Sequence, residues 1–273
     1  MKGKKTITHH TDSQGARPRF RWLQIILIAL ITPCTSPGFA KSGPLDDIWI
    51  GDHAQPPINL YIARTQLTRD PADVRIHALK TWLDHVARRA SVSFQLRPAS
   101  AERWQVELTQ EPDSCALANA RLPDREQSAH WLLPVLRDSL VIVGRADDPF
   151  QGDVGTLLRQ ADGAIGAASG IYRVTLEQRG IRYIPVDDQG AIIQMIDMGR
   201  LRFGLLVGSA ALTHTGPGHI RILGKIADID FWFSCSRLME PERVARLRQA
   251  LERGENERLR LEFLSLWARR PAP

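Results

Sequence analysis

The sequence lacks the short motifs that carry most enzymatic and metal chemistry. It contains no Gly-x-Ser-x-Gly elbow, no Cys-x-x-Cys pair, no His-Glu-x-x-His helix and no glycine-rich phosphate loop. His214 and His219 flank a Thr-Gly-Pro-Gly turn, but two histidines without nearby acids or thiols make a poor metal site and are typical of a surface loop. We therefore expect no enzymatic activity, no metal ion and no other cofactor.

Clusters of basic residues interleaved with aromatics are also missing, although the chain of 273 residues carries 36 Lys or Arg against 30 Asp or Glu. Six of the bases and one acid, Asp12, lie within residues 1–40. The rest of the chain holds 30 bases and 29 acids, a formal net charge of +1. Because no electrostatic footprint for a phosphate backbone remains, we expect no nucleic-acid partner.

Near its start the chain has a short apolar run, Leu23 to Ile31, in place of a membrane-spanning one. A helix of that length rises only about 14 Å, whereas the hydrocarbon layer is roughly 30 Å thick. The run follows the six bases and precedes Gly38-Phe39-Ala40, a pattern that signal peptidases cleave. The sequence predicts a signal peptide over residues 1–40, cleavage after Ala40 and a periplasmic location. An uncleaved amino-terminal anchor and a lipid anchor on Cys34 are the alternatives.

Cysteine is scarce, with three residues in the whole chain and two, Cys115 and Cys235, beyond the predicted cleavage point. The periplasm permits disulfides, but a bridge requires the two Cα atoms to lie within about 7 Å of each other. The sequence leaves two alternatives open, one bridge or two buried free thiols.

Strand and helix patterns alternate between residues 163 and 207. The predicted elements are a strand over Gly163 to Ala167, a helix over Ile171 to Arg179, a strand over Ile181 to Val186, a helix from Asp187 or Asp188 through Met198, and a strand over Phe203 to Val207. Further strands are predicted over residues 91–96, 140–143, 220–223 and 231–235, and two helices follow Pro241. This alternation predicts an α/β fold with mostly parallel sheets, whose ligands bind beyond the carboxyl ends of the strands.

Six segments carry a resemblance to a known family. In order they are Cys115 to Glu126, Trp131 to Pro134, Leu140 to Arg145, Gly166 to Gly170, Asp187 to Met198 and Gly199 to Phe203. The first three are similar to the Thr-Pro-Glu-Arg-Glu-type motif, the Phe-Ser-x-Pro-type turn and the apolar hinge strand of the bacterial extracellular solute-binding proteins of family 3. The last is similar to that family's Gly-Arg-x-Asp segment, and the resemblance covers most of residues 45–265.

The resemblance implies a two-lobed α/β fold of the type II periplasmic-binding-protein class, each lobe a mostly parallel sheet flanked by helices. Lobe I would comprise residues 41–145 plus 223–273, with the carboxy-terminal helices returning to it, and lobe II residues 146–222. The lobes would close around a ligand by hinge bending, and we expect a monomer. A single continuous sheet, or Arg125 far from any groove, would contradict this expectation.

Arg125 stands at the arginine of the family's motif, which in amino-acid binders grips the carboxylate of the ligand. A guanidinium suits that role because its rigid fork of donors matches two carboxylate oxygens. Leu122 replaces the hydroxyl residue of the family's motif. The alternative is that Arg125 pairs with Asp124 or Glu126 on a solvated turn.

Five further residues are candidates for the ligand site. Ser169, Gly170 and Ile171 lie at a strand-to-helix turn, where free N–H groups and the helix dipole favour an anion, although Ser169 alternatively just caps the helix. Trp104 and Trp131 are candidate cleft walls by their place in the family pattern, and core packing is the alternative for each.

Two departures from the family pattern bear on the ligand. Arg202 stands where the Gly-Arg-x-Asp segment has its acid, and Leu205 to Gly208 offer no carboxylate to an α-ammonium group. The sequence therefore favours a small anionic or neutral polar ligand over a typical amino acid, or a pocket that has lost ligand binding. The leading hypothesis is a periplasmic solute-binding protein that serves the permease of an ABC-type transporter. A ligand sensor for a membrane receptor and a dehydratase-like enzyme on the same fold are the alternatives.

Overall fold

The computed structural model describes residues 48–52, 54, 56–63, 73–216, 219–252 and 254–267, without the side chains of Asp124 and Trp267. The predicted signal peptide, its cleavage site after Ala40 and Cys34 lie outside these residues. None of the helices described combines the length and the hydrophobicity that a membrane crossing needs.

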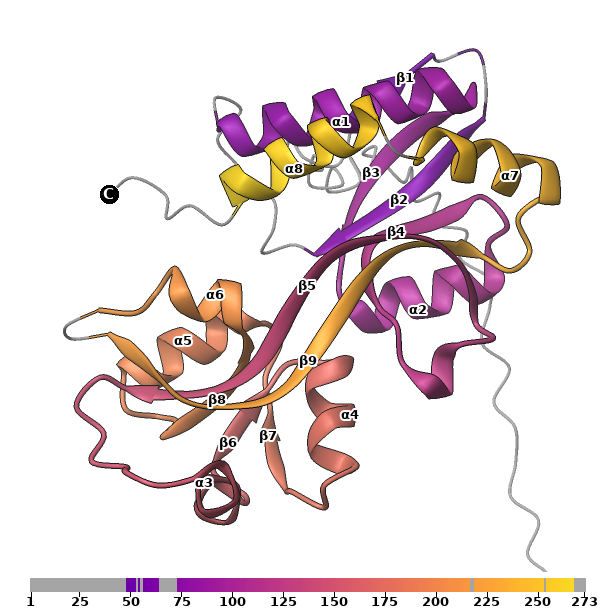
Figure 1. The fold of residues 1–273 in the computed structure, drawn as a ribbon. Coiled ribbons are helices and arrows are strands. Elements are labelled where there is room, and N and C mark those ends of the chain that lie inside the picture. Colours follow the sequence, from indigo (N-terminus) through magenta and orange to yellow (C-terminus); the bar gives the residue numbers. More distant parts are fainter. Residues whose placement is uncertain are drawn as a thin grey trace, which may run out of the picture. The chain divides into compact units, whose positions relative to one another are not determined.

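Strands and helices alternate through most of the described chain (Figure 1). The strands are β1 (Trp49–Gly51), β2 (Pro57–Ala63), β3 (Ser93–Ala99), β4 (Ser114–Ala120), β5 (Ala129–Arg145), β6 (Ile165–Ala167), β7 (Tyr183–Pro185), β8 (Phe203–Val207) and β9 (Ile220–Ser236). The helices are α1 (Val74–Ala90), α2 (Ala101–Gln110), α3 (Val154–Ala161), α4 (Ile171–Glu177), α5 (Gln189–Asp197), α6 (Gly208–Leu212), α7 (Pro241–Ala250) and α8 (Glu255–Trp267), with a 3-10 turn, η2, at Pro123–Arg125.

Several helices begin at a residue whose side chain caps the backbone. Asp73, Ser100, Asp153 and Asp188 each accept a hydrogen bond from a backbone N–H two or three residues further on. Such caps satisfy N–H groups that have no partner within the helix. Of the two predicted starts of α5, the structure has Asp188 rather than Asp187 at the cap.

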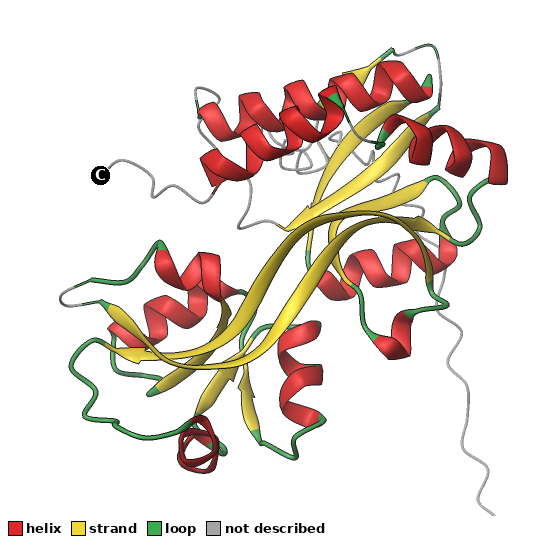
Figure 2. Ribbon diagram, viewed as in Figure 1, coloured by secondary structure: helices red, strands yellow, loops and turns green. Residues whose placement is uncertain are grey.

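The nine strands of the described chain form one hydrogen-bonded sheet in the order β1-β3-β2-β4-β9-β5-β8-β6-β7. The pairs β2–β3, β2–β4, β6–β7 and β6–β8 are parallel, whereas β4–β9, β9–β5 and β5–β8 in the middle are antiparallel. We call β1–β4 with α1, α2, α7 and α8 the first lobe, and β6–β8 with α3–α6 the second lobe; Figure 2 shows the helices gathered at the two ends of the sheet. The residue bounds predicted for the lobes stay a prediction, because β5 and β9 belong to both.

The continuous sheet differs from the expected separate sheet in each lobe. β5 and β9 have 17 residues each and pair from Ala129↔Ser236 to Arg145↔Ile220, so hydrogen bonding runs from one lobe into the other. The side-chain cores nevertheless stay distinct: one cluster surrounds Trp82 and Phe94, and two others consist mainly of second-lobe residues. A continuous sheet therefore does not exclude two lobes, and the expectation that it would contradict the two-lobed fold was wrong.

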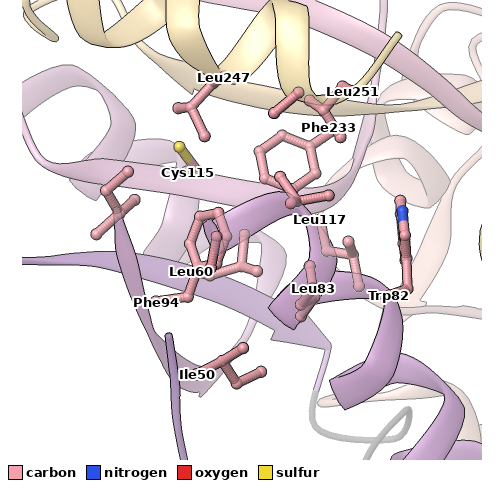
Figure 3. Close-up of a cluster of buried hydrophobic side chains, with 14 of the residues drawn as sticks. Ile50, Leu60, Trp82, Leu83, Phe94, Cys115, Leu117, Phe233, Leu247 and Leu251 are labelled. Carbon is pink, nitrogen blue, oxygen red and sulfur yellow. The ribbon is translucent and has the colours of Figure 1, made fainter. Parts of the chain in front are cut away.

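The two carboxy-terminal helices pack against α1 in the first lobe. The ring of Phe263 stacks on Trp82 with 5.7 Å between centroids, and the indole N–H of Trp82 donates to Asn256 Oδ1 at 2.7 Å. Figure 3 shows Leu247 of α7 and Leu251, the residue that follows α7, in the same buried cluster. Residues far apart in the sequence thus build one core.

A disulfide joins β4 to β9. Cys115 and Cys235 lie directly opposite each other in the antiparallel pair, with 3.9 Å between their Cα atoms, and both are fully buried. The bridge, rather than two free thiols, is therefore the observed alternative.

Candidate functional site

A cleft of about 1150 Å³ lies between the two lobes. From the first lobe it is lined by the carboxyl ends of β2, β3 and β4, by α2 and by η2. From the second lobe it is lined by the turns β6–α4, β7–α5 and β8–α6, and β5 and β9 contribute residues between the lobes. The position matches the edge at which ligands of parallel α/β sheets bind.

The structure brings four of the six predicted ligand-binding residues to this cleft, namely Trp104, Arg125, Ser169 and Ile171. Gly170 and Trp131 are not among its lining residues. Ligand binding by any of the six stays a prediction.

The turn η2 holds Arg125 at the cleft. Pro123 begins η2, where its fixed φ suits the first position, and the N–H of Arg125 donates to Leu122 O at 2.9 Å. The neighbouring Glu126 is bound instead by Arg121, whose Nε lies 2.9 Å from Oε2, and these hydrogen bonds lower the pKa of Glu126. Within the described residues no carboxylate pairs with Arg125, so the alternative of an ion pair with Glu126 is wrong. The alternative of an ion pair with Asp124 lies outside the described side chains.

Neutral groups surround the Arg125 guanidinium. The Gln105 amide, turned with its oxygen toward them, accepts from Arg125 Nη1 and from Trp104 Nε1, each at 3.3 Å. In the reverse orientation it donates to Asn119 Oδ1 at 2.6 Å but sets its NH₂ group against the two other donors. The first orientation requires the Asn119 amide to turn as well, so that its NH₂ group donates to Gln105 and its oxygen accepts from Ser234 Oγ, and we favour this arrangement. Trp104 also packs against Tyr61 in a buried cluster, so it is a core residue and a cleft wall at once.

Trp131 belongs to a group of partly exposed side chains next to η2. Its indole N–H donates to Glu126 O at 3.0 Å, and the Arg121 guanidinium lies over its ring at 5.6 Å and over the Trp232 ring at 4.4 Å. These contacts engage Trp131 in cation–π packing outside the cleft, which departs from its predicted place as a wall.

The turn before α4 differs from the predicted cap. Gly170, with φ +80°, is the N-cap residue of α4, and no side chain caps that helix, so Ser169 does not act as the cap. A Cβ built on Gly170 would lie 2.9 Å from the Cβ of Ala101 in α2. Gly170 therefore touches the first lobe, and only a residue without a side chain fits there.

Asp138 on β5 is a cleft residue that the sequence reasoning missed. Its carboxylate accepts from Ser209 Oγ at 2.6 Å and from the Ser139 N–H at 2.7 Å. Burial and this neighbouring carboxylate raise the pKa of Tyr172, which also lines the cleft. Leu205 to Gly208 carry no acid, but Asp138 on the adjacent strand brings one to the same corner, and the class of ligand stays a prediction.

An ion pair spans the mouth of the cleft. Arg173 of α4 donates through Nη1 to Glu102 Oε1 of α2 at 3.2 Å, and its Nη2 donates to Val186 O at 3.4 Å. Together with the contact between Gly170 and Ala101, this pair joins the amino-terminal ends of α2 and α4. The two lobes therefore touch through α2 and α4 as well as being connected by β5 and β9.

A metal site is not evident in the part of the chain that the structure describes, where no group of three or more His, Cys, Asp or Glu side chains is placed to hold an ion. His214, on the turn considered above, instead contacts Thr213 Oγ1 and Ala210 O through its Nδ1, at 2.9 and 3.0 Å.

Comparisons with known proteins bear on the fold. The sequence matches no protein-family model and no curated protein. Among solved structures, the BvgS periplasmic domain of B. pertussis is similar with a TM-score of 0.59 and 15% identity, covering 79% of this chain and 44% of that one. A histidine kinase sensor domain with similarity to periplasmic binding proteins gives 0.61 at 14% identity, covering 76% and 96%. An ancestral arginine-binding protein bound to glutamine gives 0.63 at 12% identity, covering 79% and 99%.

These likenesses establish the fold. The chain has the two-lobed α/β fold of type II periplasmic-binding-protein-like domains, as the sequence predicted, and the similar structures are binding proteins and sensor domains. The chain spans less than half of the first of them, the BvgS periplasmic domain.

Proposed function

We propose that this chain is a periplasmic solute-binding protein, a divergent relative of family 3, that captures a small polar or anionic ligand between its lobes for an ABC-type transporter. The observation that carries the proposal is the Arg125 guanidinium, which lines the cleft between the lobes without a carboxylate partner among the described residues. An uncompensated guanidinium with a fork of donors favours an anionic oxygen pair as its partner.

Closure of the lobes would complete the site. The cleft takes its lining from both lobes, and the Arg173–Glu102 pair crosses its mouth. In such a fold a ligand that contacts both lobes stabilises the closed arrangement by its greater affinity for it. Occupancy of the cleft would thereby set the surface that a permease contacts.

A thermal-shift screen of the purified chain against organic acids, oxyanions, sugars and amino acids tests the proposal. A ligand at a hundred times its Kd stabilises the native state by about 2.7 kcal/mol. For an anionic ligand, Arg125→Gln should weaken binding by tens of fold, because it removes a charge-assisted contact. Arg159→Gln is the matched control, since Arg159 is exposed, donates to Thr156 Oγ1 and lies outside the cleft. Equal affinity of the wild-type and Arg125→Gln chains would remove Arg125 from the site.

A sensor role is the second candidate, favoured by the likeness to a histidine kinase sensor domain. In that case the closed chain would contact a membrane receptor instead of a permease. Co-purification of the ligand-loaded chain from membranes, followed by identification of the retained membrane protein, separates the two: a permease supports transport, and a receptor with a kinase or cyclase domain supports sensing.

A further inference from the structure

The cleft has a polar extension along one flank of α2. We call it the side groove and define it by Asn59, Tyr61, Arg97, Arg103 and Glu107, all of which line the cleft. Tyr61 and Arg97 are register partners on β2 and β3, so their side chains lie on the same face of the sheet, the face that α2 covers. The side groove is thus built by the strands of the first lobe together with α2.

Arg97 is the uncompensated charge of the side groove. Its Nε donates to Asn59 Oδ1 at 3.1 Å and its Nη2 donates to Gln95 Oε1 at 2.6 Å. Both partners are neutral amides, and in the described part of the chain no carboxylate forms an ion pair with Arg97. The two amides fix a half-buried guanidinium without neutralising it.

The acid within the side groove is already neutralised. Glu107 is buried and forms an ion pair with Arg103 one turn earlier on α2. Burial and the Glu107 carboxylate also raise the pKa of Tyr61 to about 12, which keeps its hydroxyl protonated as a donor. Glu111 lies at the exposed end of α2, where solvent screens its charge. The Tyr61 hydroxyl donates to Glu107, so the side groove offers a ligand one guanidinium without a carboxylate partner among the described residues.

Helix α2 separates Arg97 from Arg125. Gln105 on α2 faces Arg125, and Glu107, two residues later, faces Tyr61 beside Arg97. Residues two apart on a helix point about 200° apart, and a helix with its side chains is about 10 Å wide, so the two guanidinium groups are separated by a distance of that order. A compact ligand reaches only one of them.

From this arrangement we infer that the ligand is elongated and carries two acidic groups, one bound by Arg125 and the other by Arg97 in the side groove. The inference rests on the proposed function and adds to it a class of ligand and a second anion-binding residue. The ligand would pass the amino-terminal end of α2, where Ser100 and Ala101 also line the cleft, and the contact between Gly170 and Ala101 would have to open to admit it.

Matched carboxylate series test the inference without knowledge of the natural ligand. The probes are the α,ω-dicarboxylates from succinate to sebacate and the monocarboxylates of the same carbon numbers, compared by thermal shift and by calorimetry at constant ionic strength. The longer dicarboxylates should bind about tenfold more tightly than their monocarboxylate partners, and the shorter ones no better, since only a long chain spans α2.

Substitutions test whether Arg97 causes the tighter binding of the long dicarboxylates. Arg97→Gln should abolish the advantage of the long dicarboxylates over their monocarboxylate partners, whereas Arg125→Gln should weaken both series. Arg97→Lys should keep part of the advantage, because it preserves the charge and loses the fork, and Arg159→Gln should match the wild type. The wild-type comparison of the two series does not depend on any variant folding.

The possible outcomes distinguish a failure of the inference from a failure of the proposed function. Equal affinity for the paired mono- and dicarboxylates, or an advantage that survives Arg97→Gln, overturns the inference and leaves the proposed function standing. Stabilisation by other members of the ligand screen but by neither carboxylate series also overturns the inference alone. No stabilisation by any compound in either experiment counts against the proposed function itself, and the inference fails with it.

Discussion

The two lobes share one sheet but differ in how their cores are built. The first lobe has parallel strands of seven residues, with large side chains such as Trp82 and Phe94 fully buried between the sheet and its helices. The second lobe has strands of three to five residues and relies on close approach, because Cβ atoms built on Gly166 or Gly204 would collide with neighbouring side chains. The first lobe is thus the larger platform, and the second is a tightly fitted smaller unit.

The lobes also differ in the charge they bring to the cleft. The arginines without a carboxylate partner among the described residues, Arg97 and Arg125, belong to the first lobe and η2. The α2 carboxylates Glu102 and Glu107 are paired with Arg173 and Arg103, whereas Asp187 and Asp188 of the second lobe and Asp138 of β5 form no ion pair within the described residues. If the ligand is an anion, as proposed, its unpaired positive partners would come from the first lobe and η2.

Removal of the disulfide in the first lobe should have the largest effect on stability. A Cys115→Ala/Cys235→Ala double variant loses a cross-link between residues 120 apart in the sequence, and the expected loss of unfolding free energy is about 2–5 kcal/mol. Denaturant titration followed by the near-ultraviolet signal measures it. The wild-type chain in reductant should behave like the double variant, and an unchanged denaturation midpoint would show that the first lobe does not depend on the bridge.

A smaller effect, confined to the second lobe, is expected from Gly204→Val. A Cβ at this position would overlap Ile192 and lie 3.0 Å from Ile196 of α5, so we expect overpacking to lower the unfolding free energy by about 1–3 kcal/mol. Hydrogen exchange should show faster exchange in β8 and α5 and little change in α1. Gly155→Ala on the exposed side of α3 is the control, and accelerated exchange in both lobes alike would contradict separate cores.

The smallest effect is expected at the contact between the lobes. Glu102→Gln and Arg173→Gln each remove a partly exposed ion pair, and their coupling energy in a double-mutant cycle should be about 0.2–1 kcal/mol. Small-angle scattering of the single variants should give a slightly larger radius of gyration than that of the wild type. Strict additivity of the two substitutions would mean that this pair contributes nothing to holding the lobes together.

The regular part of the second lobe was predictable from the sequence. The strand Phe203–Val207 was predicted with its observed bounds, and the helix after Asp188 begins where its cap indicates. Both elements combine an apolar run with a nearby start or stop residue, and local patterns of this kind decide structure within a single element.

The long central strands could not be predicted in full. The sequence indicated residues 140–143 and two separate strands over 220–223 and 231–235, whereas β5 and β9 each extend over 17 residues. Their polar middle parts, including Asp138 and Lys225, lack the apolar alternation of a half-buried strand. These parts are strands because each pairs with the other, and that partnership is a tertiary contact.

The residues of the candidate site also differ in how far the sequence could predict them. The family resemblance led to Arg125, because the motif and its turn are local, but no local pattern distinguished Asp138 or Arg97 from surface charges. Whether Asp138 or Arg97 can bind a ligand depends on whether its charge is already paired and on which wall of the cleft it lies. That information arises only when β3, β5 and α2 come together.

The bridge between Cys115 and Cys235 has a mechanical consequence. It fastens one of the two connecting strands to β4, whose last register partner on β9 is Phe231. If the lobes close by hinge bending, as proposed, the bend would lie beyond that partner and nearer the second lobe, where the pairing of β9 with β5 shifts register between Leu140 and Val141 and again between Ile142 and Val143. The first lobe would then hold its end of β9 fixed, and the second lobe would move against it.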